Sequence, residues 1–254
     1  MSASQSPLIG WVDLTTPDVE SASTFYTGLL GWSTTTHETP MGAYTSCSIP
    51  SGEVAGMMAP GPGAPTDMAF WSIYLRVTDL DDVLAAATAA GGTTIMGPME
   101  IPGDTRIAVV TDATGAAISL MESADATPWP QGEPGAVVWC EELTRQPGRA
   151  IAFHSEVFGW TAEHKEGTTP YTLLWAGDTM VGGLMMMPEM VPAEAPAHWQ
   201  VYFAVDDCPA TCARAEELGG KILVPPTTID EGRFALLSDP HGAVFGVMDH
   251  PSGS

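Results

Sequence analysis

Basic residues are scarce in this chain of 254 residues. Eight Lys and Arg stand against 31 Asp and Glu, which gives a formal net charge of −23. Nucleic-acid binding requires clustered Lys and Arg that displace counterions from phosphates, and attraction to an anionic membrane surface requires the same clusters. The scarcity of basic residues therefore excludes both partner classes, and the acidic excess indicates a solvated outer surface.

Long apolar runs and cysteine motifs are also lacking. No stretch approaches the ~20 apolar residues that span a membrane, and residues 1–10 lack the basic and apolar regions of a secretory signal. The four cysteines, Cys47, Cys140, Cys208 and Cys212, form no disulfide or zinc signature. We therefore expect reduced thiols and a cytoplasmic protein. Hydrophobic residues make up 44% of the chain, enough for a folded core.

The most informative feature is an internal repeat. The segment FYTGLLGW at residues 25–32 returns as FHSEVFGW at residues 153–160, an offset of 128. Three more landmarks return in order with offsets of 128, 128 and 127: residues 57–60 at 185–188, 77–79 at 205–207, and 111–115 at 238–242. A near-constant offset indicates duplication. We predict an N-terminal domain at residues 1–123, a Pro- and Gly-containing linker at 124–135, and a C-terminal domain at 136–254.

Within each half the pattern predicts two βαβββ modules and hence an α+β fold. In the first half we expect strands at 8–15, 72–77, 106–111 and 116–121, with helices at 17–30 and 81–90. Gly31 and the pair Gly91 and Gly92 follow the two helices as stop signals. The second half repeats this order, so the whole chain contains four modules.

This layout, with its Phe-Tyr…Leu-Gly-Trp helix and its Asp-Pro-His-Gly turn, resembles the vicinal-oxygen-chelate superfamily of glyoxalases, bleomycin-resistance proteins and extradiol dioxygenases. The resemblance covers residues 7–251 and is nearest to two-domain actinobacterial members that behave like a fused dimer. It implies two similar glyoxalase-like domains, each with a curved mixed sheet around a ligand cavity.

The resemblance also implies where a divalent metal would bind in catalytic relatives. The family's His, Gln and Glu positions fall on Trp11, Trp139, Ser72, Gln200, Ser119 and Gly246, and near residues 56–58 and 184–186. Among these only Gln200 offers a metal ligand, and one neutral amide does not hold a metal. We therefore predict no metal and no cofactor at the family position.

Without a metal, the same positions are candidate ligand contacts. Trp11 and Trp139 are expected to form aromatic platforms, or else to fill the space that the metal leaves. Met57 and Met185 either line adaptable binding walls or fill ordinary core. The predicted ligand-binding set is Trp11, Trp139, Ser72, Tyr74, Gln200, Ser119, Gly246, Met57 and Met185.

Four side chains are candidates for acid–base chemistry. Strand alternation places Asp13 on the face of Trp11 and Glu141 on the face of Trp139. It likewise places His198 and Tyr202 on one face with Gln200, and His has a suitable pKa for proton transfer. For the two carboxylates the alternative is a solvated position at the cavity rim, and for His198 it is an exposed strand start.

Three hypotheses for function follow. The first is a metal-independent protein that binds a planar, largely apolar small molecule, for sequestration or resistance. The second is a metal-free enzyme of secondary metabolism, a hydroxylase-labelled, isomerase or lyase type that uses His198, Asp13, Glu141 or Tyr202. The third is a structural descendant without a ligand. We expect a monomer or weak homodimer, and for the first two hypotheses the partner is a small molecule, aromatic in character.

Overall fold

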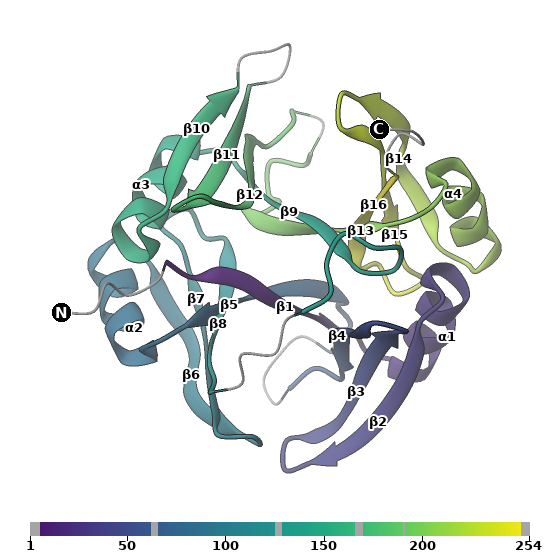
Figure 1. Cartoon of the computed structure of the whole chain (residues 1–254), viewed down its shortest axis with the longest axis horizontal. Coiled ribbons are helices and arrows are strands. Elements are labelled where there is room, and N and C mark those ends of the chain that lie inside the picture. The colour runs from purple at the N-terminus through teal and green to yellow at the C-terminus, as the bar shows by residue number, and fades with distance from the viewer. Residues whose placement is uncertain (1–5, 62–65, 125–128, 166–169, 190, 250–254) are drawn as a thin grey trace. The chain divides into compact units, whose positions relative to one another are not determined.

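The structure is a computed structural model that describes residues 6–61, 66–124, 129–165, 170–189 and 191–249. These residues form sixteen strands and four helices (Figure 1). The first half contains β1 (Leu8–Thr15), α1 (Val19–Leu30), β2 (Ser33–Thr39), β3 (Gly42–Ile49), β4 (Gly52–Met58), β5 (Phe70–Val77), α2 (Leu80–Ala89), β6 (Thr93–Ile101), β7 (Thr105–Thr111) and β8 (Ala117–Glu122).

The second half repeats that order of elements. It contains β9 (Val137–Thr144), α3 (Pro147–Phe158), β10 (Thr161–Lys165), β11 (Tyr171–Ala176), β12 (Thr179–Met186), β13 (His198–Ala204), α4 (Cys208–Glu217), β14 (Lys221–Ile229), β15 (Gly232–Ser238) and β16 (Val244–Asp249). The predicted α+β class with four βαβββ modules is confirmed. None of the helices in the described part of the chain is long and apolar enough to cross a membrane.

Each half forms one curled mixed sheet of eight strands. The strand orders are β2-β3-β4-β1-β5-β8-β7-β6 and β10-β11-β12-β9-β13-β16-β15-β14. The first strand of each module pairs in parallel with its last strand, as β1 does with β4, whereas the connected hairpins are antiparallel. The register places Asp13 beside Gly56 and Glu141 beside Gly183.

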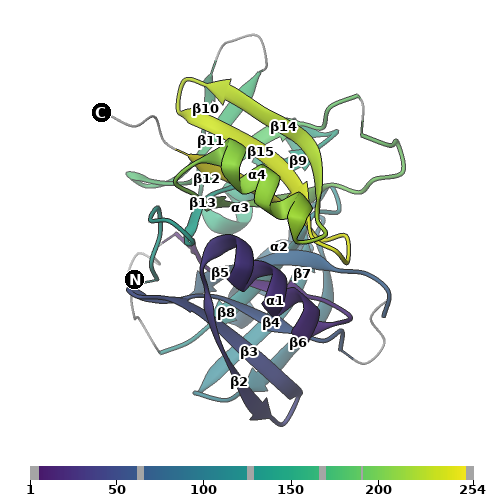
Figure 2. The ribbon, with the colours of Figure 1, turned by 90° about the vertical axis from the view of Figure 1, so that its right-hand side faces the viewer.

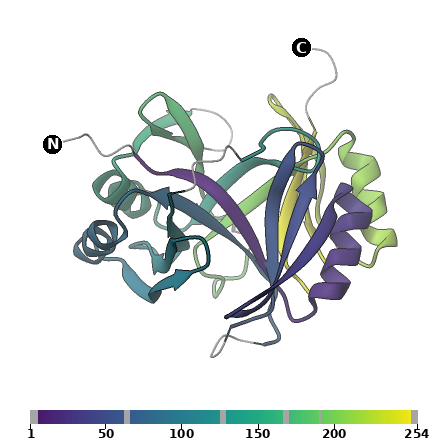
Figure 3. The ribbon, with the colours of Figure 1, turned by 60° about the horizontal axis from the view of Figure 1, so that its bottom comes forward.

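The chain divides into two compact units that regroup the modules. Unit 1 comprises residues 1–10, 73–127 and 140–199, and unit 2 comprises residues 11–72, 128–139 and 200–254. Each unit thus takes one module from each half, and four of the five unit boundaries fall within β1, β5, β9 and β13. In unit 2, α1 and α4 are neighbours (Figure 2), and in unit 1, α2 and α3 are neighbours (Figure 3).

In each repeated Gly-Gly pair the first glycine adopts the turn that follows the helix, and the second allows close packing. Gly91 has φ +89° and ends α2, whereas a Cβ at Gly92 would lie 2.8 Å from the ring of Phe153 on α3. In unit 2 a Cβ at Gly220 would lie 3.0 Å from the ring of Phe25 on α1. The second glycine therefore lets an aromatic ring of the neighbouring helix pack directly on the backbone.

Candidate ligand-binding site

A hydrogen-bonded triangle of Trp11, Asp13 and Tyr44 lies on one face of unit 2. The Trp11 indole Nε1 donates to Asp13 Oδ1 at 2.8 Å and to the Tyr44 hydroxyl oxygen at 3.0 Å. The Tyr44 hydroxyl in turn donates to Asp13 Oδ1 at 2.8 Å. Asp13 is only 5% exposed, so two donors replace the water that its carboxylate gives up on burial.

Gly56 on the neighbouring strand makes room for this triangle. A Cβ at residue 56 would overlap the Tyr44 hydroxyl oxygen and Asp13 Oδ1. The family's metal-binding carboxylate is expected in the segment 56–58, so the phenol and the carboxylate from β1 occupy the space above that segment. Alanine at position 56 is incompatible with the observed triangle, because the Tyr44 hydroxyl would have to move.

Unit 1 carries a second copy of the carboxylate–tyrosine pair. Tyr171 donates to Glu141 Oε2 at 2.6 Å, and a Cβ at Gly183 would overlap the Tyr171 hydroxyl oxygen. Glu141 is 7% exposed. Residues 44 and 171, like residues 56 and 183, are 127 apart, so duplication preserves the carboxylate, the tyrosine and the glycine. Sequence reasoning missed both tyrosines and both glycines, although their shared offset is a signal that could have found them.

Two further groups adjoin the triangle in unit 2. The Trp129 ring lies 6.2 Å from that of Trp11 at an interplanar angle of 47°, and its Nε1 donates to the Val54 carbonyl at 3.0 Å. His37 Nε2 lies 3.1 Å from the Ser46 hydroxyl, and Ser46 pairs with Gly56 across β3 and β4. Trp129 belongs to the predicted linker and was not a candidate from the sequence.

The other predicted ligand contacts are less accessible to a bound molecule. A Cβ at Gly246 would overlap the Tyr202 ring, so an aromatic ring covers this family position in unit 2. The Gln200 amide donates to the carbonyls of Val201 and Val244 at 3.2 and 3.3 Å. In unit 1, Tyr74 pairs in register with the buried Ser119.

His198, Ser72 and Trp139 are partly exposed. His198 Nδ1 donates to the Pro196 carbonyl at 3.0 Å, which leaves Nε2 as the acceptor of the neutral ring. The structure divides the predicted group of His198, Gln200 and Tyr202 between unit 1 and unit 2. It does bring Asp13 together with Trp11.

The two methionines proposed as a matched pair are not structurally equivalent. Met57 pairs with Leu14, and its sulfur accepts from Ser23 of α1 at 3.7 Å, so this fully buried side chain faces the helix. Met185 pairs with Leu143. By strand register Met57 therefore corresponds to Leu184, because the offset in this strand is 127 and not the 128 expected from the sequence. The one-residue difference lies between residues 33 and 44, in the preceding hairpin.

A different polar cluster lies in the interior of unit 1. His154 Nε2 is 2.5 Å from Glu142 Oε2, and the Thr114 hydroxyl reaches both Glu142 and Asp112. Burial raises the pKa of both carboxyl groups, and the nearby charge of Glu142 raises the pKa of Asp112 further. Burial lowers the pKa of His154, so the imidazole is neutral at pH 7. Sequence analysis assigned no chemical role to Asp112, Glu142 or His154.

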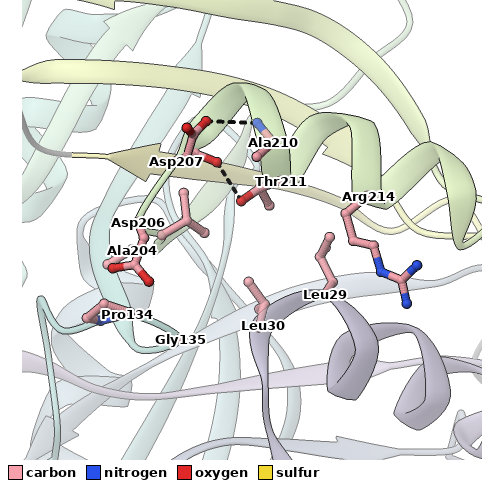
Figure 4. Close-up of a pocket in the computed structure, with 11 residues that line it drawn as sticks. Leu29, Leu30, Pro134, Gly135, Ala204, Asp206, Asp207, Ala210, Thr211 and Arg214 are labelled. Atoms are coloured by element: carbon pink, nitrogen blue, oxygen red, sulfur yellow. Dashed lines mark hydrogen bonds between the residues drawn. The ribbon is translucent and has the colours of Figure 1, made fainter.

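A groove of about 380 Å³ lies in unit 2 between the end of α1 and the start of α4 (Figure 4). Leu29 and Leu30 form one side, Asp206 lies near the start of α4, and Arg214 donates to Glu217 at 2.8 Å. A smaller groove of about 230 Å³ recurs between α3 and α2 in unit 1. Because both lie at equivalent helix ends, the fold itself generates them.

The family's metal does not fit the residues that stand at its positions. An indole N–H only donates, Gly56 and Gly246 offer no side-chain ligand, and a tyrosine covers each glycine. Asp13 is the carboxylate nearest to the position in unit 2, and Tyr44 and Trp11 already bind its Oδ1. The site instead presents a hydrogen-bonded carboxylate and phenol beside two indole rings.

Comparison with known proteins agrees with this architecture. The model of the Glyoxalase/Bleomycin resistance protein/Dioxygenase superfamily matches residues 8–120, and that of a glyoxalase-like domain matches residues 138–248. A Mycobacterium tuberculosis protein named putative glyoxylase CFP32 is 40% identical over 248 residues, covering 94% of this chain and 93% of its own. The anthracycline biosynthesis protein DnrV of Streptomyces peucetius is 37% identical over 265 residues, covering 96% and 93%.

Solved structures show the same fold at low identity. The Mn(II)-bound glyoxalase from Novosphingobium aromaticivorans superposes with a TM-score of 0.69 at 16% identity, covering 97% of this chain and 83% of its own. The 2,3-dioxygenase LapB from Pseudomonas sp. KL28 gives a TM-score of 0.64 at 16% identity, covering 97% and 95%.

Proposed function

Because the chain belongs to the glyoxalase/bleomycin resistance protein/dioxygenase superfamily, we propose that it binds a planar, largely apolar small molecule without a metal at the family position. The observation that carries this proposal is the triangle of Trp11, Asp13 and Tyr44 above Gly56. Indole rings stack on flat ligands, and a few fixed polar groups set their orientation.

The polar groups also favour a class of ligand. Asp13 and Glu141 are buried carboxylates, each paired with a tyrosine hydroxyl. A carboxylate in such a site attracts hydroxyl or ammonium donors and repels anions. The preferred ligand is therefore a polycyclic aromatic compound that carries phenolic hydroxyl or amine groups. The relatives named for anthracycline biosynthesis support a role in the handling of an aromatic secondary metabolite.

An intracellular binder of this kind would sequester its ligand, as a monomer or weak homodimer in the cytoplasm. Binding is tested by tryptophan quenching with the planar dihydroxyanthraquinone quinizarin and with an anthraquinone sulfonate of similar size. We expect quinizarin to quench and to bind at least about ten-fold more tightly than the sulfonate, a difference of about 1.4 kcal/mol. Equal binding of the two compounds would contradict the role of the carboxylates.

The second candidate is a metal-free enzyme, favoured by the same pairs because a phenol bound to a carboxylate can pass a proton. His198, with Nε2 as the acceptor, is the other candidate base. Asn at position 13 keeps the acceptor oxygen, so Asp13→Asn should leave quinizarin affinity nearly intact in a binder but abolish turnover in an enzyme. His198→Ala serves as the matched test, and conversion of the ligand by the wild-type chain would favour the enzyme.

A further inference from the structure

The buried cluster of unit 1 combines three metal-ligand side chains from three elements. Asp112 follows β7, Glu142 lies on β9 and His154 lies on α3. Each is at most 2% exposed, and one potential ligand atom from each lies within 4.8 Å of the others. Neighbouring strand residues point to opposite faces, so Glu142 faces away from the side of Glu141. The cluster is therefore separate from the family's metal position.

The equivalent place in unit 2 shows that the fold does not require two of these side chains. Asp239 replaces Asp112 and makes the same turn bonds, since both aspartates accept from backbone N–H groups two and four residues later. Leu14 stands at the position of Glu142, and Tyr26 at that of His154. Asp112 thus has a structural role in the turn, whereas Glu142 and His154 are additional to it.

The cluster has two carboxylates and no basic counter-charge. No Lys or Arg within the described ranges pairs with Asp112 or Glu142, and the group in contact with Glu142 is the His154 imidazole. Burial of two neighbouring carboxyl groups without a basic partner is costly, and a cation bound between them offsets that cost. A bound divalent ion would supply the missing positive charge.

The Trp199 indole provides an independent observation. In unit 2 its counterpart Trp71 donates from Nε1 to the Tyr26 hydroxyl oxygen at 3.0 Å. In unit 1 the buried Trp199 Nε1 and His154 Nδ1 have no hydrogen-bond partner among the described residues, and the two rings lie 5.8 Å apart. The buried indole N–H is thus placed for an oxygen acceptor beside His154, such as the water or hydroxide that completes a metal coordination shell.

We propose that Asp112, Glu142 and His154 bind one divalent first-row transition-metal ion in the interior of unit 1. One imidazole nitrogen and two carboxylate oxygens suit zinc, manganese or cobalt, with an open position for water. The ion would lie between the three ligand atoms and would open the contact between His154 and Glu142. This site is structural in character and does not depend on the proposed ligand function.

The test uses the full chain, stripped with a chelator and titrated with Zn²⁺ by calorimetry and with Co²⁺ by absorption spectroscopy. We expect one equivalent of each ion, and a Co²⁺ spectrum without the intense thiolate band that cysteine ligands produce. The variant Glu142→Leu/His154→Tyr carries the residues that unit 2 uses at the same positions, so it should fold. It should lose at least about 100-fold in affinity, because two of three protein ligands are gone.

Two control variants keep the assignment specific. Cys208→Ser/Cys212→Ser removes the two thiols that lie one turn apart on α4 of unit 2. Asp13→Asn changes the candidate ligand site of unit 2. Both variants should retain one equivalent of metal. Absence of binding by the wild-type chain at micromolar metal would overturn the proposal, as would unchanged affinity in the Glu142→Leu/His154→Tyr variant. Loss of binding only in the cysteine variant would assign the metal to α4 and would likewise overturn it.

Discussion

The two units build the same interior position from different chemistry. In unit 2, Tyr26 joins Trp71 to Asp239 through its hydroxyl, with distances of 3.0 and 3.3 Å. In unit 1, His154 contacts Glu142, which lies beside Asp112, and the Trp199 indole N–H has no acceptor in the part of the chain that the structure describes. The fold tolerates both solutions, but among the described residues only the indole of unit 2 has a hydrogen-bond acceptor. The comparison separates what the fold needs from what unit 1 has acquired.

The sheet faces opposite the helices show the reverse relation, because there the two units agree. Asp13 with Tyr44 above Gly56 matches Glu141 with Tyr171 above Gly183. The carboxylate is one methylene longer in unit 1, and Leu173 stands where unit 2 has Ser46. We therefore expect two sites of similar chemistry, with the unit 1 site more apolar.

The largest effect should come from a carboxylate placed in unit 2 without its partners. Leu14 is fully buried, and Leu14→Glu introduces an acid where Tyr26 stands in place of histidine. We expect a loss of about 3 kcal/mol or more in unfolding free energy at pH 7, because an uncompensated charge is buried or a proton must be taken up. Urea denaturation measures it, with Leu14→Met as the control. A loss below that of Leu14→Met would contradict the comparison.

Removal of one member from the unit 1 cluster should cost less. Glu142→Leu takes away the acceptor of His154 Nε2, which leaves a buried imidazole without a partner. In chelator we expect a loss of about 1–3 kcal/mol. Addition of His154→Tyr should restore or exceed wild-type stability, since Trp199 gains the hydroxyl acceptor that Trp71 already has. A double variant as unstable as Glu142→Leu would show that the two positions are not equivalent.

Substitution of the glycines should compare the two sites on these sheet faces. Gly56→Ala and Gly183→Ala each place a Cβ on a tyrosine hydroxyl. We expect each to break a hydrogen bond to a buried carboxylate, at a cost of about 1–3 kcal/mol in unfolding free energy. Gly56→Ala should also weaken quinizarin binding in unit 2. Gly148→Ala is the control, because an added Cβ at Gly148 meets open space. Gly42→Ala is unsuitable because the positive φ of Gly42 strains any side chain. Unchanged affinity in Gly56→Ala would argue against the triangle as the binding site.

The smallest effect should come from the methionines. Met57 faces α1, so Met57→Leu conserves volume in the core and should change unfolding free energy by less than about 1.5 kcal/mol, without effect on ligand affinity. Met185→Leu, on the face of Gly183, is the matched variant. Ligand titration of both variants compares the effect of the helix-facing position with that of the position on the side of Gly183. A larger loss of ligand affinity in Met57→Leu than in Met185→Leu would show that the ligand contacts the helix-facing side.

The sequence predicted the architecture well because its signals are local and repeated. The strand 8–15 agrees with β1, and the predicted helix 81–90 begins one residue after α2 does. The predicted helix 17–30 begins two residues before α1, because Asp18 is its N-cap and accepts from the Ser21 N–H. Both glycine stop signals follow the helices as expected.

The site was harder to predict because its contacts join distant strands. Tyr44 and Tyr171 lie in unremarkable strands, and only the parallel pairing of β1 with β4 and of β9 with β12 brings the carboxylates to their glycines. A one-residue difference in a hairpin shifted the apparent match of the methionines. Asp112, Glu142 and His154 share no motif spacing, so their convergence depends on how unit 1 packs.

In the function that we propose, Trp11, Asp13 and Tyr44 replace the family's metal in ligand binding. The most direct measurement is a quinizarin titration of the chelator-treated chain, before and after readdition of Zn²⁺ or Mn²⁺, beside the variant Trp11→Leu. We predict an affinity that changes less than two-fold with metal and falls at least about ten-fold in Trp11→Leu. Binding that needs added metal, or that persists undiminished in Trp11→Leu, would contradict the claim.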